Sequence, residues 1–85
     1  MLITFTEIAW EDYVYWQSTD KNVVKKINRL IKDIKRNPFY GRGKPEALKY
    51  DLTGYWSRRI EHEHRLVYQV VDKRVLVYSC RFHYD

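Results

Sequence analysis

The sequence has few of the features that mark secreted or membrane proteins. Its 85 residues include a single cysteine, Cys80, so no intramolecular disulfide can form and we expect a reducing, cytoplasmic setting. No segment approaches the roughly 18 consecutive apolar residues of a membrane span, and the first residues lack a signal peptide's basic start. With three Gly, two Pro and 45% hydrophobic residues, the composition predicts one globular domain over residues 1–85.

Several common catalytic signatures are also absent. The chain has no glycine-rich phosphate loop, no pair of cysteines at zinc-binding spacing, and no serine or cysteine nucleophile motif. His62 and His64 would point the same way on a strand and could join His83 around a metal. No cysteine or carboxylate completes a convincing ligand set, so we expect neither a metal nor another cofactor.

The charge that is present is unevenly distributed. The net charge is +5, yet the first 20 residues carry four acidic and no basic side chains, so the remaining 65 residues carry +9. A basic domain suits a polyanionic partner, because each neutralised phosphate releases counterions. The eight tyrosines fit the same reading, since rings stack on unpaired bases. Solubility and core packing are the competing explanations for the charge and for the rings.

The first half of the chain shows a strand and two helices. Residues 2–5 are a short apolar run rich in β-formers, and Thr6 can cap the helix that follows. Residues 18–20 interrupt this helix and offer a second N-cap. Residues 21–36 form the clearest helix, which ends at Asn37-Pro38. Its apolar positions recur at three- and four-residue steps: Val23, Val24, Ile27, Leu30, Ile31 and Ile34. Its basic side chains are either a solvated face or a phosphate-contacting surface.

The second half reads as a loop followed by strands. Residues 38–46 contain two glycines and two prolines and predict a loop. Short strands are expected over residues 48–52 and 56–61, and longer ones over 64–71 and 74–82, with Asp72-Lys73 as the last turn. Helices followed by antiparallel strands predict an α+β fold, with two N-terminal helices packed on one face of a mainly antiparallel sheet.

Polar side chains suited to RNA cleavage gather in this β half. A base removes the ribose 2′-hydroxyl proton, cations stabilise charge on the phosphoryl oxygens, and an acid protonates the departing 5′-oxygen. A carboxylate, one or two arginines and a histidine suffice, because Glu and His can both hold useful protonation states near neutral pH. The candidates are Glu46, Lys49, Arg59, Arg65, Arg81, His83 and Tyr84.

Several short motifs along nearly the whole chain resemble one protein family. They include Gly43-Lys44-Pro45-Glu46, Trp56-Ser57-Arg58-Arg59-Ile60, Glu63-His64-Arg65-Leu66-Val67-Tyr68 and Cys80-Arg81-Phe82-His83-Tyr84. Together with Trp10-Glu11-Asp12-Tyr13 and Val24-Lys25-Lys26-Ile27-Asn28, they resemble the Txe/YoeB branch of the RelE-like toxin superfamily. Tyr40 and Asp85 are mild departures from the family pattern.

The resemblance implies a microbial-ribonuclease-like α+β fold and a toxin that cuts mRNA in the ribosomal A site. By position, Glu46 matches the general base, His83 the general acid and Arg65 the phosphate-stabilising arginine. Lys49, Arg59 and Tyr84 match supporting residues. The products would carry a 2′,3′-cyclic phosphate or 3′-phosphate and a 5′-hydroxyl.

The resemblance also implies partners. They are the ribosome with its rRNA, the mRNA, and a YefM-like antitoxin that covers the site. Operator DNA would be bound only through the antitoxin complex, which represses its own operon. A homodimer also fits the family, and no membrane partner is implied.

Strand parity places one of these residues awkwardly. If Asp72-Lys73 is a strict two-residue turn, Arg65 pairs with Cys80 and His83 points to the opposite sheet face. Asp-Lys is not a strong dipeptide for such a turn, so we expect an odd-length loop, a β-bulge, or a bend after Phe82 to turn His83 toward Arg65.

Two functions of other classes compete with the ribonuclease. A non-catalytic RNA or ribosome binder would use the basic helix and would arrest translation without cutting. A protein-interaction module would bind an acidic partner and would have no affinity for ribosomes.

Overall fold

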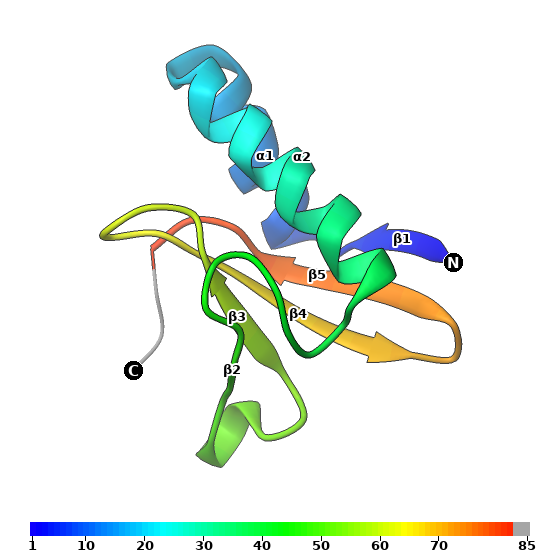
Figure 1. The fold of residues 1–85 in the computed structure, drawn as a ribbon. Helices are drawn as coiled ribbons and strands as arrows, with labels where there is room; N and C mark the ends of the chain where they lie inside the picture. Colours follow the sequence, from blue (N-terminus) through cyan, green and yellow to red (C-terminus); the bar gives the residue numbers. More distant parts are fainter. Residues whose placement is uncertain (83–85) are drawn as a thin grey trace.

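The computed structural model describes residues 1–82 and places two helices on a five-stranded sheet (Figure 1). The strand order is β1-β5-β4-β3-β2, with β1 parallel to β5 and the other neighbours antiparallel. This arrangement confirms the expected α+β class. The elements in chain order are β1 (Leu2–Phe5), α1 (Glu7–Thr19), α2 (Lys21–Arg36), β2 (Glu46–Ala47), the 3₁₀ helix η1 (Tyr50–Leu52), β3 (Trp56–Arg59), β4 (Arg65–Val71) and β5 (Arg74–Ser79).

The two helices begin at the side-chain caps that the sequence predicts. Thr6 Oγ1 accepts a hydrogen bond from the Ala9 N–H at 3.0 Å, and an Asp20 carboxylate oxygen accepts one from the Asn22 N–H at 3.0 Å. Asp20 therefore ends α1 and starts α2. Within residues 1–82, no helix combines the length and the apolarity needed to cross a membrane.

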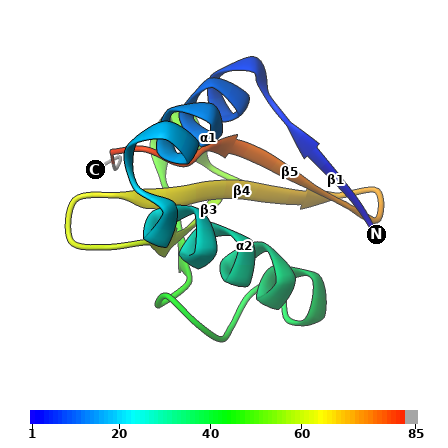
Figure 2. The same ribbon diagram turned by 90° about the horizontal axis from the view of Figure 1, so that it is seen from above.

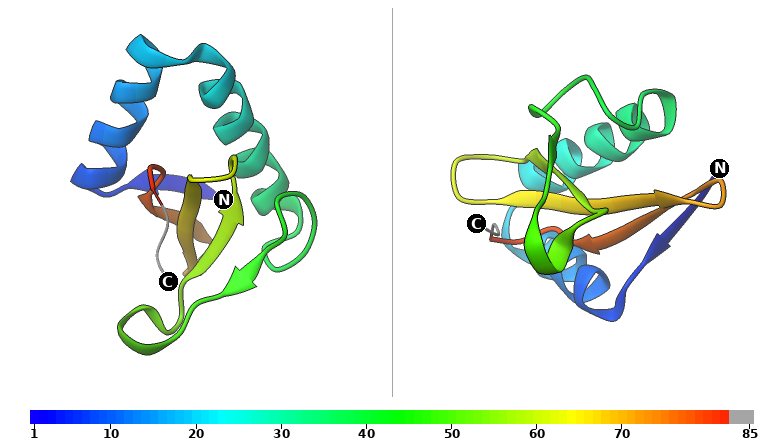
Figure 3. Two further views of the ribbon diagram at one scale, coloured as in Figure 1. Left: turned by 90° about the vertical axis from the view of Figure 1, so that its left-hand side faces the viewer. Right: turned by 90° about the horizontal axis from the view of Figure 1, so that it is seen from below.

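The hydrophobic core lies between the helix pair and one face of the sheet, and Figures 2 and 3 show this arrangement of helices and sheet from three further sides. The other face carries neither α-helix (Figure 3). Alternation along each strand sends every second side chain to that second face. Within this core cluster, the residues of α2, β4 and β5 below 5% exposure are Val23, Ile27, Leu30, Ile34, Leu66, Tyr68, Val75 and Val77.

The strand expected at residues 48–52 is wrong. The ladder beside β3 contains only Glu46 and Ala47 and continues with one bond, from the Leu48 N–H to the Tyr55 carbonyl at 2.9 Å. Tyr50 then adopts a left-handed φ of 58°, and Thr53 Oγ1 donates to its carbonyl at 2.7 Å. Local side-chain bonding of this kind competes with strand pairing and closes a 3₁₀ turn instead. β3, β4 and β5 are each one to three residues shorter than predicted.

The turn between β4 and β5 has two residues, followed by a β-bulge. Val71 pairs with Arg74, and Asp72 and Lys73 have φ values of 52° and 59°, as a type I′ turn requires. The odd-length loop is therefore wrong. A bulge is present, because Tyr68 pairs with Val77 while Val67 pairs with Ser79. The side chain of His83, which the bulge was expected to turn, lies outside the described residues.

Candidate active site on the helix-free face of the sheet

Strand register brings three of the predicted site residues to the sheet face away from the helices. Arg59 pairs with Arg65, and Glu46 pairs with Ser57, two residues before Arg59. Residues directly opposite each other, or two apart on one strand, share a face. Leu66 alternates with Arg65 and packs in the core under the helices, so Glu46, Arg59 and Arg65 face the other way.

The directly opposed pair of arginines is unusual for a sheet. Side chains opposite each other have Cβ atoms about 5 Å apart, and like charges there are destabilising. Among residues 1–82, neither Arg59 nor Arg65 forms an ion pair with a carboxylate. Glu46 is the diagonal neighbour of Arg59, at a typical distance of about 7–8 Å. The arrangement therefore has the charge of an anion-binding site with a carboxylate beside it.

Backbone carbonyls hold the Arg65 side chain in place. Its Nη1 donates to the carbonyls of Glu61, His62 and His64 at 2.9, 3.1 and 3.3 Å. All three acceptors belong to the loop that joins β3 to β4. Within the part of the chain that the structure describes, these bonds engage Nη1 alone. Since a guanidinium has five N–H donors in a fixed fork, donors on Nε and Nη2 remain for a ligand.

Glu46 follows a loop that packs closely on β3. The Arg59 N–H donates to the Gly43 carbonyl at 2.6 Å. Gly43 has φ +80°, and a Cβ there would lie 3.0 Å from the Arg59 carbonyl oxygen. Lys44 is also left-handed, with φ 51°. The loop therefore needs glycine at position 43 to reach β3 and to start β2 at Glu46.

Arg58 positions this loop from inside the core, and the sequence analysis assigned it no role. Its side chain is fully buried, and its Nη1 lies 2.6 Å from Asp33 Oδ2 of α2. The same guanidinium donates to the Tyr68 hydroxyl and to the carbonyls of Asn37, Tyr40 and Arg42. Strand alternation offered a signal, because Arg58 lies two residues from both Trp56 and Ile60, which pack in or against the core.

Phe82, the last residue that the structure describes, lies beside Arg65 and His64. The Arg65 N–H donates to the Phe82 carbonyl at 2.8 Å, and the Phe82 N–H donates to His64 Nδ1 at 2.7 Å. Phe82 has a left-handed φ of 62°, and the His64 ring also contacts Trp16 edge-on at 4.7 Å between ring centroids. His64 is a second residue that the sequence analysis passed over, having been weighed only as a metal ligand. The predicted acid His83 and its neighbour Tyr84 lie outside the described residues.

Two other predicted residues stand apart from this cluster. Lys49 is exposed and lies just before η1, three residues beyond Glu46. Arg81 places its guanidinium 3.7 Å from the centroid of the Tyr15 ring on α1. His62 is exposed, and residues 1–82 contain no group of three potential metal ligands.

Burial shifts the pKa values of two side chains that lie close together, Cys80 and Asp12. Burial raises the pKa of the Cys80 thiol to about 12, so the thiolate is scarce at neutral pH. Burial also raises the pKa of Asp12, although its carboxylate accepts a hydrogen bond from the Cys80 N–H at 3.0 Å. Cys80 thus lacks the properties of a nucleophile.

Comparison with known proteins identifies the family of the chain. Residues 5–84 match the family described as YoeB-like toxin of bacterial type II toxin-antitoxin system. The chain belongs to this family. It is 60% identical to the toxin YoeB of Escherichia coli strain K12 over 84 residues, which cover 99% of this chain and 100% of that protein.

Solved structures of YoeB toxins share the fold. A YoeB/ParE toxin from Agrobacterium tumefaciens is 55% identical and superposes with a TM-score of 0.96, covering 99% of this chain and 100% of that chain. A YoeB-YefM complex from Staphylococcus aureus is 57% identical, with a TM-score of 0.91 and 99% coverage of both chains. A YoeB dimer from the same organism is 58% identical, with a TM-score of 0.93, covering 99% of this chain and 98% of that chain.

Proposed function

We propose that this YoeB-like toxin is a metal-free endoribonuclease that cleaves mRNA in the ribosomal A site and so inhibits translation. The observation that carries the proposal is the Arg59–Arg65 pair on the helix-free face, with Glu46 diagonally beside it. Two opposed guanidinium groups stabilise the charge that develops on a phosphoryl group, and the carboxylate supplies a base.

The proposed reaction is a transesterification. Glu46 removes the proton from the ribose 2′-hydroxyl, and the 2′-oxygen attacks the adjacent phosphorus. Arg65, assisted by Arg59, stabilises the phosphoryl oxygens, and His83 protonates the departing 5′-oxygen. Lys49 and Tyr84 support substrate binding and the phosphoryl group. The products carry a 2′,3′-cyclic phosphate or 3′-phosphate and a 5′-hydroxyl.

The proposed partners follow from the family. A YefM-like antitoxin would bind this chain, in line with the solved YoeB-YefM complex from Staphylococcus aureus. It would cover the site, and the pair would bind operator DNA and repress its operon. A second copy of the chain is a further partner, in line with the solved dimer. The ribosome would present the mRNA.

A cleavage assay on programmed ribosomes tests the proposal. We expect Glu46→Gln to lower the cleavage rate by about 10²–10⁴, the usual range for one proton-transfer partner, and His83→Gln to do the same. Glu7→Gln on the exposed side of α1 removes one carboxylate far from the site and serves as the matched control. Mapping the RNA ends identifies the products.

The rival functions give different outcomes in the same assay. Translational arrest without cut message would replace the proposal with a non-catalytic ribosome binder. An absence of ribosome affinity would favour a protein-interaction module. Unchanged cleavage in both the Glu46 and the His83 variants would remove these residues from the mechanism.

A further inference from the structure

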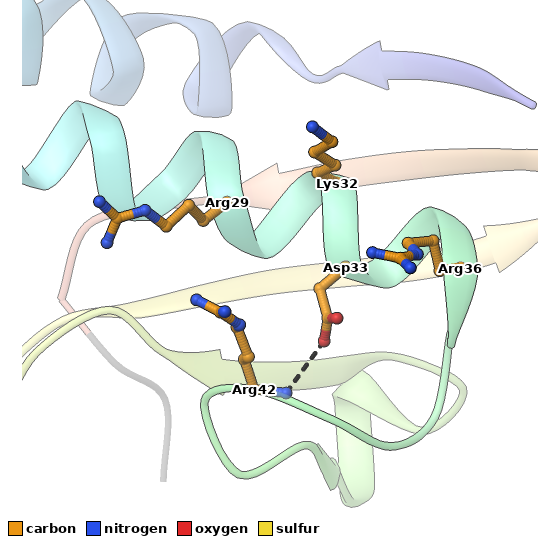
Figure 4. A pocket seen from close by; sticks show the side chains of 5 residues that line it. All are labelled: Arg29, Lys32, Asp33, Arg36 and Arg42. Carbon is orange, nitrogen blue, oxygen red and sulfur yellow. Dashed lines mark hydrogen bonds between the residues drawn. The ribbon is translucent and has the colours of Figure 1, made fainter.

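A basic hollow lies between the second half of α2 and the loop that follows it (Figure 4). Its volume is about 250 Å³, far above the roughly 10–15 Å³ that admits one water. Arg29, Lys32 and Arg36 recur at three- and four-residue steps and so lie along one side of α2. In Figure 4, Arg42 extends from the loop toward the helix, whereas Lys32 points away from Arg42 and the loop. The lining residues are Arg29, Lys32, Asp33, Arg36 and Arg42.

The positive charge of this hollow is not neutralised within the protein. Asp33 is its one lining carboxylate, and Asp33 Oδ2 already accepts bonds from Arg58 Nη1 at 2.6 Å and from the Arg42 N–H at 2.9 Å. The Arg42 N–H and the Arg58 guanidinium hold the pKa of Asp33 below its usual value, so its charge balances that of buried Arg58. Among residues 1–82, none of the four lining cations forms an ion pair.

The backbone that follows α2 is held by buried Arg58, whose guanidinium donates to the carbonyls of Asn37, Tyr40 and Arg42. Asn37 is the C-cap of α2, so one terminal carbonyl at the negative end of the helix dipole is bound by a cation. Arg42 is thereby held on both sides, through its N–H by Asp33 and through its carbonyl by Arg58. Its guanidinium projects from a fixed backbone.

A second, smaller hollow adjoins the first. Its volume is about 110 Å³, and Arg29 and Arg42 line both hollows. Arg59, the arginine opposite Arg65, lines the smaller one together with Lys26 and Leu30. Residues of α2, the loop and β3 therefore line two adjoining hollows, and Arg59 of the candidate active site belongs to the second.

We infer that the hollow formed by Arg29, Arg36 and Arg42 binds a backbone phosphate of the RNA, outside the cleaved bond. The inference rests on the proposed function, because it assigns to the same RNA a second phosphate contact away from Arg59 and Arg65. Lys32, whose side chain points away from the loop, adds only long-range attraction. An acidic protein segment is the competing occupant, and the experiment separates the two.

The experiment measures how RNA affinity depends on salt. The probe is a short single-stranded RNA with 2′-O-methyl groups, which has no free 2′-hydroxyl to attack the phosphorus. The hollow variant is Arg29→Gln/Arg36→Gln. The matched control is Lys25→Gln/Lys35→Gln, which removes two exposed charges from the same helix but none that lines either hollow. Each lost phosphate contact lowers the slope of log K against log salt by about 0.7.

We expect the hollow variant, which loses one phosphate contact, to lose about 0.7 from this slope and on the order of 10-fold in affinity at 0.1 M salt, while the control keeps most of both. Equal losses in the two variants would overturn the inference. Retained RNA affinity with lost affinity for poly-glutamate would overturn it in favour of an acidic protein partner. Wild-type protein that shows the hollow-dependent slope but cuts no message on ribosomes would reject the proposed function and leave the phosphate site standing.

Discussion

Arg58 and Arg59 are neighbours on β3, yet the two faces of the sheet give them opposite surroundings. Arg58 is fully buried under α2, where a carboxylate, a hydroxyl and three carbonyls accept hydrogen bonds from its guanidinium. Arg59 is exposed on the helix-free face opposite another arginine, with its side chain in no ion pair among residues 1–82. A buried side chain whose donors are hydrogen-bonded is typical of a residue that maintains the fold. Two adjacent arginines without a neutralising carboxylate are typical of a ligand site.

The largest expected effect is on stability and comes from removing Arg58. Arg58→Met leaves Asp33 and the loop carbonyls without their donor, and breaking a buried ion pair costs about 3–5 kcal/mol. Arg59→Met relieves repulsion with Arg65, so its effect is near zero or stabilising by about 0.2–1 kcal/mol. Urea unfolding of both variants measures the difference. Similar stabilities for the two would show that buried Arg58 contributes no more to the free energy of unfolding than exposed Arg59.

The second prediction concerns the loop between α2 and β2, which contains Gly43. Gly43→Ala forces a left-handed φ on alanine, which costs about 1–2 kcal/mol, and adds a Cβ 3.0 Å from the Arg59 carbonyl. Gly54→Ala is the matched control, since Gly54 has φ +97° but the nearest atom, Gln69 Nε2, would be 3.4 Å away. We expect the Gly43 variant to unfold at lower urea concentration than the control. Equal midpoints would mean that contact with β3 does not constrain the loop.

The third prediction tests how the chain end is held beside Arg65. His64→Phe keeps an aromatic ring against Trp16 but removes the acceptor for the Phe82 N–H, a loss of about 1 kcal/mol. His64→Asn keeps an acceptor near the position of Nδ1. We expect faster hydrogen exchange at the Phe82 amide in the Phe variant than in the Asn variant. If the proposed function holds, cleavage falls in the same order, because residue 83 follows Phe82 directly.

Uniform exchange in both variants would mean that Arg65 alone, through its N–H bond to the Phe82 carbonyl, fixes the segment. The Phe82 amide is the sensitive position because its hydrogen-bond partner is a side chain that each variant changes. The amide of Arg65 serves as an internal reference, since its acceptor is a backbone carbonyl that neither substitution removes.

Local signals explain what the sequence could predict. The bounds of α2 were predicted correctly because Asp20 caps its start and its apolar residues repeat over four turns. The expected strand at 48–52 failed because the turn at Tyr50 and Thr53 depends on local hydrogen bonds that have no periodicity. The pairing of Arg59 with Arg65 depends on register between two strands, and the role of Arg58 depends on a loop 16 to 21 residues away. Local spacing encodes neither the register nor the loop partners of Arg58, although strand alternation does indicate that Arg58 faces the core.

The smallest expected effect is a pH dependence on the helix-covered side. Because the pKa of Asp33 is lowered by the Arg42 N–H and by Arg58, its stabilising contribution is complete above its unfolded pKa of about 4. The contribution is lost as the pH falls below that value. We therefore expect wild type to be more stable than Asp33→Asn at pH 6. The difference in stability shrinks from pH 4 toward pH 3, with a slope against pH that corresponds to the uptake of about one proton.

Asp12 titrates in the opposite sense, because burial raises its pKa, but it is present in both proteins and cancels in the difference. The urea midpoints of wild type and Asp33→Asn at several pH values measure the contribution of Asp33 to stability. A difference that stays constant with pH would mean that Asp33 acts through its hydrogen bonds, which asparagine partly keeps, rather than through its charge. Arg58 would then be stabilised mainly by the carbonyls of the loop, and the buried side of β3 would depend on backbone contacts rather than on an ion pair.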